Sequence, residues 1–253
     1  MKDPLICPVC EGRSALFDVV DFNKSCEMGD GVPPVPSGIA IYYARCSACD
    51  FCFAPDMMAW TKEELSRRVY NDEYHLADPD YLQRRPLINA TFLNESFGER
   101  VRELQVRHLD FGGGNGLMSA ILRERGWRSC SYDPFGGDST IDPAASFDFV
   151  TAFEVFEHST DPHMLMEDLR RVLRPGGIVF FSTLLNDENI RASSRLTWAY
   201  AAPRNGHVSL FSRKSLSVLA QHHGFRFGSV SKISHVFYTE PPSWAGRIFA
   251  PRQ

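Results

Sequence analysis

The sequence predicts an α/β protein with a doubly wound, mostly parallel sheet, preceded by a small N-terminal metal-binding ribbon. From Arg107 onward, short β-type runs alternate with helical runs, which is typical of a sheet covered on both faces. Two CxxC pairs precede this region and flank a stretch rich in glycine and proline. We therefore expect a zinc-ribbon-like module, a helical connector or lid, and an α/β domain, at residues 1–55, 56–105 and 106–253.

The composition is that of an ordinary folded chain. The 253 residues are 43% hydrophobic, 12% aromatic and 23% charged, and the net charge is −4. A mildly acidic chain has no general attraction to phosphate backbones, which disfavours nucleic acid as a partner. The N-terminus lacks the features of a signal peptide, and the longest apolar run, at 177–185, is too short to span a bilayer. We expect a soluble, cytoplasmic protein.

Four of the seven cysteines form the two CxxC pairs, at Cys7, Cys10, Cys46 and Cys49. The stretch 11–45 separates the pairs, and four thiolates are the number that a tetrahedral structural zinc site uses. Such a site would stabilise a module too small to fold on its apolar core alone. A redox pair or an iron–sulfur cluster is the alternative, with Cys52 as a spare ligand.

The connector is charged and helical in pattern from Thr61 to about residue 106. Thr61 and Glu64 have the spacing of a capping box, which predicts that a helix begins there.

A glycine-rich turn follows the first predicted strand of the α/β domain and opens a helix. Gly112, Gly114 and Gly116 allow a sharp turn and a close approach to a ligand, and the helix presents free N–H groups. Position 117 is leucine, so the dinucleotide pattern GxGxxG is not met. Asp133, at the end of the next predicted strand, is placed to bind two ribose hydroxyls. The alternative is a plain turn with Asp133 as a helix cap.

Four motifs in order resemble those of the class I S-adenosylmethionine-dependent methyltransferases: LDFGGGNG, Tyr132-Asp133, FDFVTAFEVFEH and LRRVLRPGG. The resemblance covers about Arg107 to Thr239 and implies a Rossmann-like methyltransferase sheet with S-adenosylmethionine as cofactor. It implies that Asp110 lies near the methionine moiety, that the three glycines line the cofactor and that Asp133 holds the ribose. It also suggests that Phe153 lies beside the cofactor and that Tyr70 or Tyr74 caps the cofactor site, with plain packing between domains as the alternative for the two tyrosines.

One region departs from the family pattern. Only the short segment 134–147 separates Asp133 from Asp148, where the family usually has a helix, a strand and a loop that reads the adenine. Turn-forming residues fill this gap, so we expect the second helix to be lost or vestigial. Asp138 and Asp142 are the candidates for adenine contacts.

A second cluster of metal-ligating types follows the strand at 147–153. Glu154, Glu157 and His158 are spaced to share one side of a helical turn, and His207 follows the next strand. Loops after neighbouring parallel strands meet at one sheet edge, so the four side chains can converge. Mixed oxygen and nitrogen ligands suit Mg²⁺, Mn²⁺, Fe²⁺ or Co²⁺.

This arrangement resembles the ExxEH plus distal histidine of the small-RNA 2′-O-methyltransferases, and ExxEH alone resembles the ubiquinone-biosynthesis O-methyltransferases. The resemblance implies a divalent ion that chelates neighbouring hydroxyls, with His158 or His207 as the proton acceptor. The alternative is that these residues pack the cofactor loop without an ion.

The sequence therefore predicts an S-adenosylmethionine-dependent O-methyltransferase with a structural zinc site. Its acceptor would be a hydroxyl of a small molecule or glycan, assisted by Mg, Mn or Fe. The alternatives are a metal-independent sugar C-methyltransferase, an RNA 2′-O-methyltransferase and a non-catalytic scaffold that binds S-adenosylmethionine.

Overall fold

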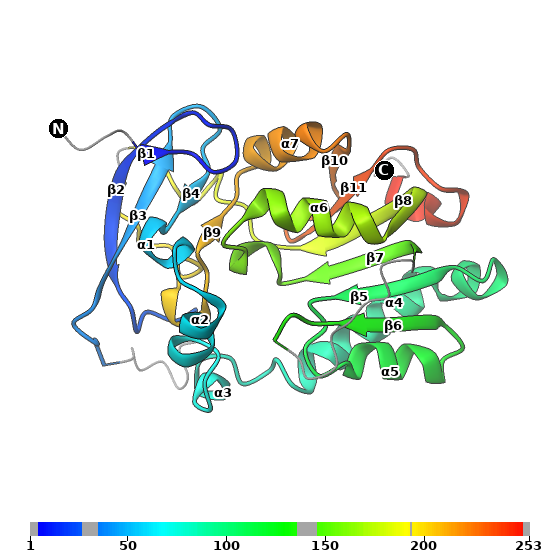
Figure 1. Cartoon of the computed structure of the whole chain (residues 1–253). Coiled ribbons are helices and arrows are strands. Elements are labelled where there is room, and N and C mark those ends of the chain that lie inside the picture. The colour runs from blue at the N-terminus through cyan, green and yellow to red at the C-terminus, as the bar shows by residue number, and fades with distance from the viewer. Residues whose placement is uncertain (1–4, 27–34, 136–145, 193, 250–253) are drawn as a thin grey trace. The chain divides into compact units, whose positions relative to one another are not determined.

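The computed structural model describes residues 5–26, 35–135, 146–192 and 194–249 (Figure 1). The chain forms two compact units, each assembled from segments that are far apart in the sequence. The cysteine unit comprises residues 1–79, 156–165 and 184–219, and the parallel-sheet unit comprises residues 80–155, 166–183 and 220–253. The N-terminal residues thus fold together with two later segments.

The sheet of the cysteine unit is antiparallel, with strand order β1-β2-β3-β4-β9. Its strands are β1 (Leu5–Ile6), β2 (Arg13–Asp21), β3 (Ala40–Cys46), β4 (Cys52–Phe53) and β9 (Ser209–Leu210). The last of these comes from a distant part of the sequence and pairs with β4 in the register Cys52↔Leu210. This pairing joins the N-terminal ribbon to the segment that follows His207.

Short helices complete the cysteine unit: α1 (Pro55–Met58), α2 (Lys62–Arg68), α3 (Tyr74–Ala77), η2 (Phe156–His158) and η3 (Pro203–Asn205). The predicted capping box at the start of α2 is confirmed. The Glu64 amide donates to Thr61 Oγ1 (3.2 Å) and the Thr61 amide donates to Glu64 Oε2 (3.1 Å).

The parallel-sheet unit has six strands in the order β10-β11-β8-β7-β5-β6. They are β5 (Arg107–Phe111), β6 (Arg128–Tyr132), β7 (Phe147–Phe153), β8 (Leu173–Ser182), β10 (Arg226–Ser229) and β11 (Ser234–Tyr238). Strands β6, β5, β7 and β8 are mutually parallel, whereas β11 is antiparallel to both β8 and β10. The mixed α/β fold with a central sheet is therefore confirmed.

Both faces of this sheet are covered, as the burial of successive residues in β8 shows. Ile178, Val179, Phe180 and Phe181 each have 0% exposure, although their side chains alternate between the two faces. One face packs against α4 (Arg84–Glu103) and α5 (Leu117–Glu124) in a core that includes Phe97, Leu122 and Phe149. The long apolar strands require this double coverage.

The remaining helices are α6 (Pro162–Val172), α7 (Arg213–His222), η4 (Ser243–Ala245) and α8 (Gly246–Phe249). Strand β8 begins directly after α6 and continues through Pro175-Gly176-Gly177, and its register with β7 shifts between Phe147 and Phe149. Gly177 lies at this irregularity, and a Cβ there would be 2.9 Å from the Asp148 carbonyl oxygen. Among the described residues, no helix is long and apolar enough to cross a bilayer.

Three parallel strands end at the same edge of the sheet. The glycine-rich turn follows β5, Asp133 follows β6, and Glu154 follows β7. The shortened segment between β6 and β7, with Asp138 and Asp142, lies mostly outside the described residues. The carboxyl edge is where ligands bind in sheets of this kind.

Candidate cofactor and metal sites

The glycine-rich turn is sharp and is held to the next strand. The amides of Gly112 and Gly113 both donate to the Tyr132 carbonyl oxygen, at 2.7 and 3.0 Å. Gly112 has a φ of 75°, and a Cβ there would lie 2.4 Å from Val155 Cγ2. Glycine is therefore required at position 112 by both backbone conformation and space.

Gly113 was missed by the sequence reasoning, which chose its two neighbours from the spacing alone. A Cβ at this position would lie 2.3 Å from Ser131 Oγ and 2.4 Å from Asp110 Oδ2. The signal was visible as an unbroken run of glycines, but only the packed strands show that Gly113 makes room for the Asp110 carboxyl group.

The outer part of the turn is open and lies against Asp133. A Cβ on Gly114 would meet nothing within 4 Å, and the Gly114 amide donates to Asp133 Oδ2 (2.8 Å). Gly116, with a φ of 74°, is the cap residue that leads into α5, and Asn115 Oδ1 accepts from the Leu117 amide at 3.1 Å. An open glycine loop, a helix start and an acid at the next strand end fit a nucleoside with ribose hydroxyls.

Asp110 is buried on β5 beside this loop, with 4% of its surface exposed. Its Oδ1 accepts a hydrogen bond from Thr151 Oγ1 at 3.1 Å. Burial raises the pKa of the Asp110 carboxyl group to about 7; the hydrogen bond from Thr151 opposes this rise and the nearby Asp133 adds to it. The carboxyl group therefore titrates near neutral pH.

Phe153 and Tyr74, which we expected beside the cofactor, belong to different units. Phe153 ends β7 and packs edge-on against Phe180, with ring centroids 5.9 Å apart. Tyr74 is buried on α3, where its hydroxyl donates to the Asn205 carbonyl oxygen (3.3 Å) and its ring contacts Tyr70. Their roles toward a cofactor stay predictions.

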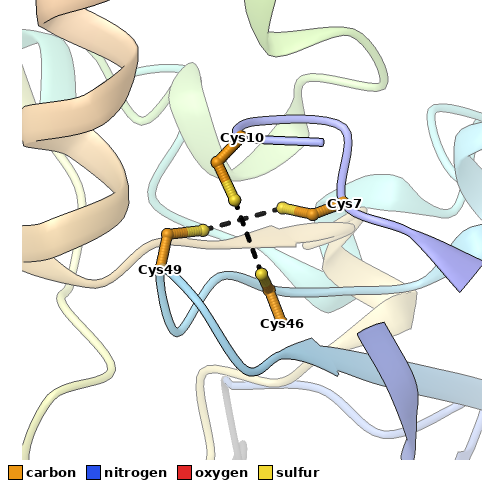
Figure 2. Close-up of side chains that lie close together, drawn as sticks. All are labelled: Cys7, Cys10, Cys46 and Cys49. Carbon is orange, nitrogen blue, oxygen red and sulfur yellow. Dashed lines mark hydrogen bonds between the residues drawn. The ribbon is translucent and has the colours of Figure 1, made fainter. Parts of the chain in front are cut away.

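The four cysteines of the two CxxC pairs converge in the cysteine unit (Figure 2). The Sγ atoms of Cys7 and Cys49 are 3.6 Å apart, those of Cys10 and Cys46 are 3.5 Å apart, and all four lie within 4.8 Å of one another. Ligands of a tetrahedral zinc with Zn–S bonds of about 2.3 Å lie about 3.8 Å apart. The observed spacing fits such an ion.

Each CxxC turn also points a backbone amide at its first sulfur. The Val9 amide donates to Cys7 Sγ (3.4 Å), and the Ala48 amide donates to Cys46 Sγ (3.3 Å). Such N–H···S bonds are outer contacts of the kind that orient metal-binding sulfur atoms. The turns are thus built to hold negative sulfur atoms close together.

The thiol pKa values reflect this crowding. The hydrogen bond from Cys49 lowers the pKa of Cys7 to about 5, whereas the same bond raises that of Cys49. Burial raises the pKa of Cys10 to about 11. The pKa of Cys7 is therefore lowered while those of Cys10 and Cys49 are raised, and a bound cation would take the place of the protons on these two thiols.

Of two further residues, Gly12 lies against this cluster and Cys52 lies outside it. Gly12, which the sequence reasoning did not single out, lies so close that a Cβ would be 3.1 Å from Cys10 Sγ and 2.9 Å from Ala48 Cβ. Cys52, the expected spare ligand, is buried on β4 outside the group of four, and burial raises its pKa to about 12. Such a thiol is a poor thiolate ligand.

Glu157, His158 and His207 form a second cluster in the same unit, which we call the Glu–His cluster. One ligand atom from each lies within 4.8 Å of the others, and the two imidazole centroids are 5.0 Å apart. The Val208 amide donates to the Glu157 carbonyl oxygen (2.9 Å), which holds two distant segments together. Two imidazoles and one carboxylate are a common set of ligands for a divalent ion with open positions.

Backbone carbonyl groups determine which nitrogen of each imidazole can bind an ion. His158 Nδ1 lies 3.2 Å from the Gly206 carbonyl oxygen, and His207 Nδ1 lies 2.8 Å from that of Tyr200. A carbonyl oxygen can only accept, so both Nδ1 atoms carry the proton in the neutral rings and both Nε2 atoms carry the lone pair. This outer contact is typical of metal-binding histidines.

Glu154, which we expected as a fourth ligand, is not a member of the described group of three. It lies in the parallel-sheet unit, where its Oε2 pairs with Arg85 Nη1 at 2.5 Å and its amide donates to Ser182 Oγ at 2.9 Å. The φ of Glu154, 54°, excludes it from the helical turn that we expected it to share with Glu157 and His158, and the observed turn is only η2. The i, i+3 spacing of Glu154 and Glu157 therefore does not correspond to one face of a helix.

Two tyrosines that the sequence reasoning missed support the Glu–His cluster. The Tyr200 hydroxyl donates to Glu157 Oε1 (2.5 Å), and the buried Tyr43 hydroxyl donates to the His207 carbonyl oxygen (2.6 Å). Tyr43 lies on β3 and Tyr200 lies in the segment between β8 and β9. No local motif marks either residue, because their partners lie in distant parts of the sequence.

Comparison with known families agrees with the fold. The sequence profile of a family described as "Methyltransferase domain" matches residues 69–230, which is more than half of the chain. The chain therefore belongs to this methyltransferase-domain family. The matched range includes the glycine-rich turn and the Glu–His cluster and excludes the four cysteines.

Curated relatives and solved structures carry similar names. Ubiquinone biosynthesis O-methyltransferase of Idiomarina loihiensis is 32% identical over 112 residues, which cover 35% of this chain and 43% of the relative. The protein of the same name from Actinobacillus pleuropneumoniae is 26% identical, with coverages of 44% and 54%. A methyltransferase structure from Aquifex aeolicus is 17% identical, covers 66% of this chain and 97% of that one, and has a TM-score of 0.43. The chain spans about half the length of the curated relatives it matches.

Proposed function

We propose that the chain is an S-adenosylmethionine-dependent O-methyltransferase that acts on a hydroxyl of a small molecule, with a divalent ion at the Glu–His cluster. The observation that carries the proposal is the convergence of Glu157, His158 and His207 with both Nδ1 protons directed at carbonyl oxygens. Family membership and the names of the relatives support the methyl transfer.

The residues of the glycine-rich turn would bind and orient the cofactor. Asp133 would hold the ribose hydroxyls, the open backbone at Gly114 would allow close approach, and Asp110 would present its carboxyl group near the methionine end. When bound, S-adenosylmethionine supplies an electrophilic methyl group. In-line transfer needs little more than proximity and orientation from the protein.

At the Glu–His cluster, Glu157 and the two Nε2 atoms would hold the ion, with Tyr200 orienting the carboxylate. A divalent ion lowers the pKa of an acceptor hydroxyl, which makes it a nucleophile near neutral pH. Without an ion, His158 or His207 would serve as the general base. A chelating acceptor with two neighbouring hydroxyls is the substrate class that suits the first case.

The four cysteines would hold a structural zinc. Four thiolates close the coordination sphere, so this ion would stabilise the cysteine unit and take no part in methyl transfer.

Metal analysis and a paired acceptor assay test this proposal. We expect one tightly bound zinc per chain and a second, labile site that chelator empties and Mg²⁺, Mn²⁺ or Fe²⁺ refills. With 3,4-dihydroxybenzoate as the probe, formation of S-adenosylhomocysteine should depend on the added ion, and the matched 4-hydroxybenzoate should be a poorer acceptor. Equal turnover of both acceptors after chelation would exclude metal assistance.

A metal-independent sugar C-methyltransferase is the second candidate, in which His158 or His207 would act as the general base without an ion. NMR of the product distinguishes the two, because a new carbon–carbon bond and a new methyl ether have different methyl shifts.

A further inference from the structure

A line of buried polar side chains crosses the parallel sheet and ends at Asp110. It runs through Ser119 on α5, Ser129 on β6, His108 on β5 and Thr151 on β7, and none of the five is more than 4% exposed. The face of a covered sheet is ordinarily apolar, and each buried polar group needs a partner. Every contact in this line is between 2.7 and 3.1 Å.

The direction of the hydrogen bonds can be assigned from the serine end. Ser119 Oγ donates its one proton to the Cys130 carbonyl oxygen (2.7 Å), which can only accept. The 2.9 Å contact between the two serine hydroxyls then requires Ser129 to donate to Ser119. Ser129 has no second proton, so His108 Nδ1–H donates to Ser129 Oγ at 2.8 Å.

At the other side of the ring, the Thr151 hydroxyl has one proton and three acceptors, of which the Leu109 carbonyl oxygen is the most distant at 3.5 Å. Thr151 Oγ1 is 3.0 Å from His108 Nε2 and 3.1 Å from Asp110 Oδ1. When Nδ1 carries the imidazole proton, Nε2 accepts the proton of the Thr151 hydroxyl. Thr151 then has no proton left for Asp110, so a hydrogen bond between them needs a neutral Asp110 carboxyl group that donates to Thr151 Oγ1. When Asp110 is ionised, it takes the Thr151 proton, and Nε2 must carry the imidazole proton instead.

We propose that His108 is a positioning residue for Asp110: its neutral imidazole changes tautomer when the Asp110 carboxyl group gains or loses its proton. Ionisation releases one proton in all. The Asp110 proton leaves, the imidazole proton moves from Nδ1 to Nε2, and the Ser129 hydroxyl turns from Ser119 to Nδ1. The effect that this change would have on cofactor affinity rests on the proposed function, because it assumes that the glycine-rich turn binds S-adenosylmethionine.

The charges around the line agree with this coupling. Burial lowers the pKa of His108 to about 3, so the ring is neutral near pH 7 and only its tautomer can change. Trp127 and Phe149 pack against the ring, with centroids 5.5 and 5.3 Å away. Asp133 is the charged group that acts on Asp110, and Thr151 and Ser129 are the polar groups that β7 and β6 direct at His108. Ionisation of Asp110 would also break the hydrogen bond from Ser129 to Ser119. Because this bond is lost only in the ionised state, it favours the neutral carboxyl group.

NMR on the cofactor-free protein tests the coupling. The ¹³Cγ shift of Asp110 reports its protonation, and long-range ¹H–¹⁵N spectra report the tautomer of His108. We expect the Nδ1–H form below the Asp110 midpoint and the Nε2–H form above it. A single tautomer throughout the titration would overturn the proposal.

Two variants should move the Asp110 midpoint in opposite directions. His108→Phe leaves Thr151 free to donate to the carboxylate and should lower the midpoint by about 1 pH unit, whereas Thr151→Val removes that donor and should raise it by a similar amount. If His108→Phe fails to fold, Ser129→Ala removes the acceptor of Nδ1–H and should also lower the midpoint. Midpoints that do not move, or that move together, contradict the coupling.

Ser229→Ala is the matched control, because Ser229 Oγ lies 2.9 Å from His235 Nδ1 in the same unit, away from this line. It should leave the Asp110 titration unchanged. Calorimetry with S-adenosylhomocysteine is a separate measurement: its affinity should fall as pH drops through the Asp110 midpoint, since the neutral carboxyl group attracts the ligand ammonium group less. Absence of binding at every pH would contradict the proposed function and leave the tautomer result standing.

Discussion

The four-cysteine cluster and the Glu–His cluster lie in the same unit but are assembled in different ways. Each CxxC turn brings two sulfur atoms together within one short motif and adds its own N–H···S bond. The Glu–His cluster joins η2 to a residue far along the chain, and it depends on hydrogen bonds from Tyr43 and Tyr200. The first cluster is mostly local, whereas the second exists only in the folded unit.

The two clusters are connected through the sheet of the cysteine unit. Strand β3 carries Tyr43 and ends at Cys46, and β4 pairs with β9, which follows His207. The Ser212 hydroxyl further donates to the Cys49 carbonyl oxygen at 2.6 Å. We therefore expect an asymmetry, in which damage to the cysteine cluster disrupts the Glu–His cluster and the reverse does not occur.

Cys46→Ser should have the largest effect. It removes one thiolate from a closed set of four, and structural zinc sites contribute on the order of 10 kcal/mol to folding. Zinc content should fall, the cysteine unit should unfold by circular dichroism, and Mn²⁺ binding at the Glu–His cluster should be lost. Cys130→Ser, at the exposed cysteine on β6, is the control. A Cys46→Ser protein with full zinc and full stability would refute the asymmetry.

Glu157→Gln should be the next largest change. It removes a ligand charge and should weaken Mn²⁺ binding by at least about 10–100-fold, measured by calorimetry, with one zinc per chain retained. The exposed Glu188→Gln is the control. Glu154→Gln in parallel shows whether the residue paired with Arg85 contributes a fourth ligand. Wild-type Mn²⁺ affinity in Glu157→Gln would remove the basis of the proposed site.

Tyr200→Phe should have a smaller effect of the same kind. It keeps the ring against His207, 4.3 Å between centroids, and removes only the hydroxyl that orients Glu157. Loss of such an outer contact typically weakens metal binding by about 10-fold. If Mn²⁺ affinity does not change while the free energy of unfolding falls, Tyr200 serves stability alone.

Tyr43→Phe should have the smallest effect, and this effect should be a loss of stability. The lost hydrogen bond to the His207 carbonyl oxygen should lower the free energy of unfolding by about 1–3 kcal/mol, measured by urea denaturation. Tyr42→Phe, on the same strand with 45% of its surface exposed, is the matched control. Equal losses in both variants would show that the buried contact has no special role.

The order of strands and helices could be predicted because it depends on short-range patterns. The alternation of short β-type runs with helical runs predicted the parallel strands, and the Thr61–Glu64 spacing predicted the start of α2. The course of β8 through Pro175-Gly176-Gly177 could not be predicted in this way, because it depends on a register shift in the pairing with β7. Such irregularities arise from pairing with β7, which the local sequence does not show.

The sequence alone determined the α/β class, the position of the glycine-rich turn and the identity of the four cysteines, since each depends on residues that are neighbours in the chain or on a repeating spacing. Only the tertiary structure decided that Gly113 makes room for Asp110 and that Glu154 pairs with Arg85. It also decided that His108 shares a buried hydrogen-bond line with Asp110. These features depend on which side chains meet when distant strands pack, and burial then determines which of their polar atoms need partners.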